Sequence, residues 1–166
     1  SAELPNKRTA ISLVSETHGE AGLAKLLAVV ELEPRLIESV VSELKQIRPP
    51  TTDVLCLIDN DNKPILQRVA LRFAASLESD KEEAVKRIKE LFKRDRHQRS
   101  VERDAMLAIE NCLRYGSDVL PFLVRLAQRS KDELAKIQSK PFPDEELERL
   151  ALVRNERILI VIGLIR

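Results

Sequence analysis

Apolar residues recur at helical spacing along almost the whole chain, and this periodicity constrains the fold more than any other feature. In the segment 34–47 they form one stripe, while the acidic and amide side chains between them point away. The stripe consists of Leu36, Ile37, Val40, Val41, Leu44 and Ile47. A helix of this kind is stable only when its stripe is buried against other elements. The sequence therefore predicts a packed array of amphipathic helices.

Nine or ten such segments follow one another, separated by short loops with proline, glycine or capping residues. We expect helices over residues 6–16, 20–30, 34–47, 54–58, 64–77, 80–92, 99–115, 117–128, a shorter one from 130 and a final one from 144. Pro34 and Pro64 suit the first turn of a helix, where a missing N–H costs nothing. No segment alternates polar and apolar residues as a strand does. The fold class is therefore predicted to be all-α.

The longer helices start at Pro34, Pro64 and Arg99, which lie 30 and then 35 residues apart, and each follows a shorter helix. A repeat of this length is typical of helical solenoids. In this spacing, and in pairs such as 102–115 followed by 117–128, the chain resembles HEAT and armadillo repeats. The resemblance implies a right-handed stack of antiparallel helix pairs. Because few residues recur from unit to unit, an irregular helical bundle is the alternative.

The composition is that of a folded domain with an aliphatic core. Of the 166 residues, 43% are hydrophobic, 33% are charged and only 3% are aromatic. That apolar content is too high for intrinsic disorder. We treat 1–166 as a single helical-repeat domain and expect it to be a piece of a longer protein. The formal net charge of +1 gives no global field that would attract nucleic acid or a membrane.

Cys56 and Cys112 lie on apolar segments without CxxC spacing, which indicates two reduced core thiols and neither a disulfide framework nor a zinc site. The sequence contains no glycosylation sequon and no charged-then-apolar leader. Together these features favour an intracellular protein, in the cytoplasm or the nucleus.

One stretch, residues 86–103, concentrates basic groups, and we call it the basic segment. Its apolar members occupy the inner face of the predicted helix, which directs the cations outward. The candidate binding residues are Lys86, Lys89, Lys93, Arg94, Arg96, Arg99 and Arg103. They could bind nucleic acid, a phosphorylated ligand, an acidic peptide or an anionic lipid surface. Alternatively, they form an ordinary solvated helix end, paired with nearby glutamates.

No pattern of catalytic or cofactor-binding residues is present, so we expect a protein that is not an enzyme and holds no cofactor or metal. The turn 59–63 resembles the start of an EF-hand loop, but Lys63 and Pro64 replace the required oxygen donor and glycine. His18 and His97 have no second metal ligand at helical spacing. The acidic residues 144–148 suit a helix N-terminus better than a catalytic pair. A helical-repeat DNA glycosylase would rely on aromatic residues, which are scarce here.

The last apolar run, 158–165, is too short to cross a bilayer, which takes about 20 residues. We expect it to be a helix packed on a further helix or on a partner. The sequence thus favours a protein-interaction scaffold or adaptor that binds another protein or peptide, as a subunit of a larger complex. Binding of nucleic acid or a phospholigand through the basic segment is the alternative.

Overall fold

The computed structural model describes residues 20–94, 98–112, 119–139, 141 and 144–165. Every regular element among them is helical, and these residues contain no strand, which confirms the all-α class. The elements are α2 (Glu20–Leu32), η1 (Pro34–Leu36), α3 (Ile37–Ile47), α4 (Thr51–Leu55), η2 (Cys56–Asp59), α5 (Pro64–Ala74), α6 (Lys81–Arg94), α7 (Arg99–Asn111), α8 (Leu120–Gln138) and α9 (Glu145–Ile165). The helix expected over residues 6–16 lies outside the described residues.

Two expected helices, 117–128 and the one from residue 130, are in fact the single 19-residue helix α8. The sequence pattern places the start of a new helix at Ser130. The side chain of Ser130 is instead buried in the middle of α8. A serine makes an N-cap only when the chain before it leaves the helical conformation. Here the apolar residues on either side, Leu126 and Ile137, keep to one helical face, and the helix continues.

Prolines start helices as expected, and helix α4 begins without a side-chain cap. Pro34 opens the short 3-10 helix η1, and Pro64 opens α5. The residue before Thr51, Pro50, occupies the N-cap position of α4, and no side chain caps that helix. Helix α3 ends at Arg48, which takes a left-handed conformation with φ 47° and closes the last turn by a hydrogen bond from its N–H to the Leu44 carbonyl. This is an αL helix end at a non-glycine residue.

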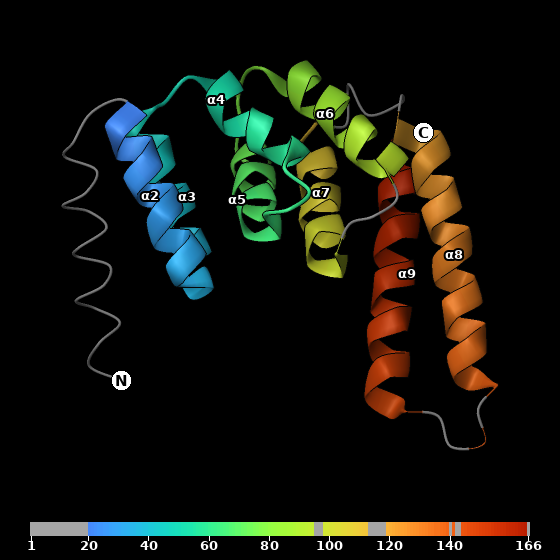
Figure 1. The fold of residues 1–166 in the computed structure, drawn as a ribbon. Helices are drawn as coiled ribbons and strands as arrows, with labels where there is room; N and C mark the ends of the chain where they lie inside the picture. Colours follow the sequence, from blue (N-terminus) through green and yellow to red (C-terminus); the bar gives the residue numbers. More distant parts are fainter. Residues whose placement is uncertain (1–19, 95–97, 113–118, 140, 142–143, 166) are drawn as a thin grey trace.

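The helices pack as successive pairs (Figure 1). Helix α2 contacts α3, α4 contacts α5, α6 contacts α7, and α8 contacts α9. Contacts also join alternate helices: α3, α5, α7 and α9 pack in sequence, and so do α4, α6 and α8. Helices α3 to α9 therefore each contact the partner in the pair and at least one equivalent helix of a neighbouring pair, whereas α2 contacts α3 and α5. The pair of α8 and α9 lies at one end of the described helices, and the pair of α2 and α3 lies at the other end. Helices α8 and α9 are longer than α7, and one end of the pair extends beyond it (Figure 1).

The core is aliphatic, as the composition predicts, and it is continuous from Leu23 of α2 to Ile162 of α9. The largest side chains that are fully buried come from every pair of helices. They are Leu26, Leu44, Leu55, Ile58, Leu71, Ile88, Leu91, Met106, Ile109, Leu123 and Ile158. Burying a side chain of this size contributes about 1.5–3 kcal/mol. The stacking of the pairs therefore rests mainly on these contacts.

The helical periodicity misplaces one of the two cysteines. Cys112 is buried as expected, and burial raises the pKa of its thiol although Lys81 acts in the opposite direction. Cys56 is exposed, so its interpretation as a core thiol is wrong. It lies where α4 passes into η2, and this change of helical twist turns it away from the buried Val54, Leu55 and Ile58.

Candidate interaction surfaces

The structure distributes the basic segment over two helices. Lys86, Lys89 and Lys93 share one face of α6, spaced by three and four residues, and Arg94 ends the same helix. Arg99 and Arg103 follow on α7, one turn apart. Arg96 lies outside the described residues. The described candidates thus belong to two different helices, α6 and α7.

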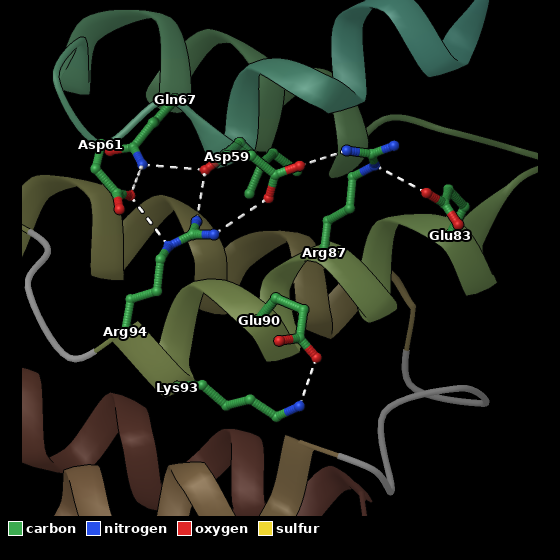
Figure 2. A network of polar contacts seen from close by, with 9 residues as sticks. Asp59, Asp61, Gln67, Glu83, Arg87, Glu90, Lys93 and Arg94 are labelled. Carbon is green, nitrogen blue, oxygen red and sulfur yellow. Dashed lines mark hydrogen bonds and ion pairs between the residues drawn. The ribbon is translucent and has the colours of Figure 1, made fainter.

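Arg94 faces inward to the turn that superficially resembles an EF-hand loop (Figure 2). Its Nη1 lies 3.3 Å from Asp59 Oδ1, its Nε lies 3.1 Å from Asp61 Oδ1, and its Nη2 donates to the Ile58 carbonyl at 3.1 Å. Arg87, which precedes Arg94 by two helical turns, pairs with the other oxygen of Asp59. The carboxylates of this turn therefore bind arginines of α6 and hold η2 against that helix.

A buried amide completes this network. Gln67 of α5 is almost fully buried and donates from Nε2 to the Ile58 carbonyl at 3.0 Å and to Asp61 Oδ1 at 3.1 Å. Figure 2 shows Gln67 and Arg94 approaching the turn from two different helices. Buried polar groups are stable when hydrogen-bonded in this way. The polar turn is thus a structural junction between α5, α6 and η2.

Other cations of the basic segment also face carboxylates of the same chain. Lys93 Nζ lies 2.5 Å from Glu90 Oε1, and this hydrogen bond lowers the pKa of Glu90. Arg99 Nη2 lies 3.2 Å from Glu133 Oε2. Lys86 and Arg103 have looser partners, at 3.8 Å, and their side chains are 74% and 65% exposed. The positive charge of the segment is therefore largely compensated locally, which agrees with its interpretation as a solvated helix end.

A buried charge cluster that no sequence pattern indicates joins α7, α8 and α9. Arg154 of α9 donates from Nε and Nη2 to the two oxygens of Glu102, at 2.6 and 2.9 Å. Its Nη1 donates to Glu133 at 2.6 Å. The side chains of Arg154 and Glu102 are only 14% and 5% exposed. Burial alone would lower the pKa of Arg154, but the hydrogen bonds and charges of Glu102 and Glu133 outweigh it, so the pKa is raised.

A second buried cluster joins α3, α5 and α7 through Asp104. This carboxylate is 2% exposed and accepts from Arg68 Nε at 2.8 Å, while Arg72 Nη2 lies 3.2 Å from its other oxygen. Arg72 also pairs with Glu38 of α3. Buried ion pairs contribute little net stability, but removing one partner leaves a costly unpaired charge. Both clusters therefore make adjacent pairs of helices depend on each other.

Helix α9 exposes several apolar side chains although its other side enters the core. Four of them, Leu150, Val153, Ile160 and Leu164, are 54–56% exposed and lie on one side of the helix; we call them the α9 stripe. Within this chain the run 158–165 divides between a buried and an exposed side, and its packing on a further helix or on a partner stays a prediction. The side chains of Ile158, Val161 and Ile162 are buried, whereas those of Leu159, Ile160 and Leu164 face solvent. The α9 stripe therefore leaves apolar surface in contact with solvent.

The acidic start of α9 serves the helix itself, as expected. Asp144 Oδ1 accepts hydrogen bonds from the backbone N–H groups of Glu146 and Leu147, both at 3.1 Å, which is N-cap geometry. Within the described ranges, no group of three or more His, Cys, Asp or Glu side chains could hold a metal ion. His18 and His97 lie outside those ranges. Among the described helices, none combines the length and apolarity needed to cross a membrane.

The arrangement can thus offer two kinds of contact: compensated charges on α6 and α7, and an uncovered apolar row on α9. Comparison with protein-family models, with characterised proteins and with solved structures found no match for this chain.

Proposed function

We propose that this chain is an interaction scaffold that binds another protein through the α9 stripe. The observation that carries the proposal is the exposure of Leu150, Val153, Ile160 and Leu164 on one side of a helix whose other side is in the core. Apolar side chains cost free energy when they stay in water, about 25 cal/mol per Å². A partner that covers this row would recover that free energy.

The packing of the helices supports a scaffold built as a HEAT- or armadillo-like solenoid. In such a stack each helix contacts its partner in the pair and the equivalent helices before and after it. The contacts of α3, α5, α7 and α9, and those of α4, α6 and α8, follow this rule. We propose a right-handed stack of antiparallel pairs, in which α9 leaves one apolar face uncovered.

The proposal is tested by comparing the proteins retained by the immobilised chain and by a variant carrying Leu150→Asp and Ile160→Asp. Both positions are on the exposed side, so circular dichroism should show unchanged helicity. A matched control is Leu32→Asp on α2, because Leu32 is 87% exposed and lies far along the chain from α9. Proteins lost with the double variant and retained with the control would support the proposal. Identical sets for all three chains would refute it.

Among the described residues of the basic segment, Lys86 and Arg103 give the best support for anion binding, because their side chains are exposed and loosely paired. A phosphate ligand would compete with Glu83 and Asp104 for them. If it binds, log affinity should fall with log salt by about 0.9 per phosphate contacted on duplex DNA. The double reversal Lys86→Glu with Arg103→Glu should then abolish binding of a short DNA duplex. Absence of any salt-dependent binding by the unaltered chain would exclude this function.

A further inference from the structure

The α9 stripe belongs to a longer row with the spacing of a helix-pairing seam. Along α9, residues 146, 150, 153, 157, 160 and 164 are separated by four, three, four, three and four positions. This 3.5-residue period is the one that places successive side chains against a second helix. The row is apolar except for Glu146 and Arg157, so these two charges decide which partner helix and which register fit.

A second copy of α9 fits in the antiparallel direction. In a parallel pair, Glu146 would face Glu146 of the second copy and Arg157 would face Arg157, and both contacts repel. In an antiparallel pair centred between Leu150 and Val153, each Glu146 faces an Arg157 of the second copy. The same register places Leu150 against Val153 on either side of the two-fold axis. A symmetric interface of this kind needs only one self-complementary surface.

The charged residues beside the row favour the same antiparallel register. Arg149 and Glu156 lie on one side of the seam, both exposed, and neither forms an ion pair with another residue that the structure describes. In the register above, Arg149 comes close to Glu156 of the second copy. Shifting the pair to the next antiparallel register, centred on residue 155, would bring the two Glu156 side chains together and place Arg157 against Val153. Charge complementarity thus favours one arrangement among those that the seam allows.

We propose that residues 145–158 of α9 pair antiparallel with the same residues of a second copy, forming a two-fold dimer. This inference rests on the proposed function, because it assigns an occupant to part of the α9 stripe. Arg157 is 43% exposed while it contacts Glu110 of α7 at 2.6 Å, so its guanidinium can face a second carboxylate. The paired segment is about 21 Å long at 1.5 Å per residue. An interface this small is typical of a weak, reversible and salt-sensitive dimer.

The test is sedimentation equilibrium of the purified chain over a range of concentrations, with charge reversals that leave the core untouched. Arg149→Glu alone and Glu156→Arg alone should each weaken self-association on the order of tenfold, because each places like charges opposite one another. An equimolar mixture of the two variants should associate like the unaltered chain, since the two glutamates of one variant then face the two arginines of the other. Lys25→Glu on α2 is the matched control and should change nothing, because Lys25 is also exposed and pairs with no carboxylate among the described residues.

A monomer at all concentrations up to the millimolar range would overturn the dimer, and so would a mixture that fails to restore association. Neither result would contradict the proposed function. That function is tested separately, by whether the immobilised chain stops retaining proteins when Leu150 and Ile160 are substituted. Conversely, a dimer that survives Leu150→Asp would show that self-association uses another surface. That outcome would also overturn the inference.

Discussion

Arg154→Met tests whether the buried charge cluster between α7 and α9 couples these helices. Methionine keeps an apolar stem of similar length but leaves Glu102, 5% exposed, without its bidentate partner. Breaking a buried pair in this way costs about 3–5 kcal/mol. Because Arg154 is 14% exposed and water can reach the site, we expect the lower end, about 3 kcal/mol. For a domain of this size that corresponds to a fall in Tm of roughly 6–12 °C.

The same helix supplies a matched control. Arg157 also donates to a carboxylate of α7 at 2.6 Å, but its side chain is 43% exposed. Solvent-exposed pairs contribute about 0–1 kcal/mol, so Arg157→Met should lower Tm by no more than about 4 °C. Both variants are compared by calorimetry at neutral pH and moderate salt. Equal losses of stability in the two variants would refute the argument, because burial would then not decide the cost of losing the arginine.

Three further predictions concern single side chains. Ser130→Ala should raise the free energy of unfolding by about 1 kcal/mol in a urea titration, because the buried Ser130 hydroxyl has no hydrogen-bond partner among the described residues. A lower free energy of unfolding would show that the hydroxyl does have a hydrogen-bond partner. Cys56 should react with iodoacetamide at pH 8 more than roughly tenfold faster than Cys112, whose raised pKa and burial disfavour the thiolate; peptide mapping by mass spectrometry that finds equal labelling would contradict this. Asp104→Asn should cost about 3 kcal/mol in the same urea titration, since it removes the charge that faces Arg68 in the interior, and an unchanged midpoint would count against that role.

The elements of this fold could be predicted from local sequence because their signals are local. Pro34 and Pro64 mark helix starts, and the apolar period identifies the buried faces of α3 and α5. The prediction fails where a local signal competes with its surroundings. Ser130 has the side chain of a cap but is buried by neighbouring helices, and Cys56 lies where a change from α to 3-10 geometry breaks the 3.6-residue period.

The polar contacts could not be predicted, because their members are far apart in sequence. Glu102 and Arg154 are separated by 52 residues, and Arg68 and Asp104 by 36. Nothing in the neighbourhood of Glu102 distinguishes it from a solvent-exposed glutamate. The basic segment illustrates the converse: its composition suggests a binding site, but Asp59 and Asp61, which compensate Arg94, come from a turn about thirty-five residues earlier.

The link between Glu102 and Arg154 also limits how this protein can be dissected. A shortened version ending after α7 would keep the apolar faces of α5 and α7 but would remove Arg154, the bidentate partner of the buried Glu102. The shortest autonomously folding segment that contains α7 should therefore extend at least through Arg154, two helices further along the chain. In a series of deletions made to map a binding region, variants that end before Arg154 would lose binding because they misfold. They would do so even if the deleted residues never contact the ligand.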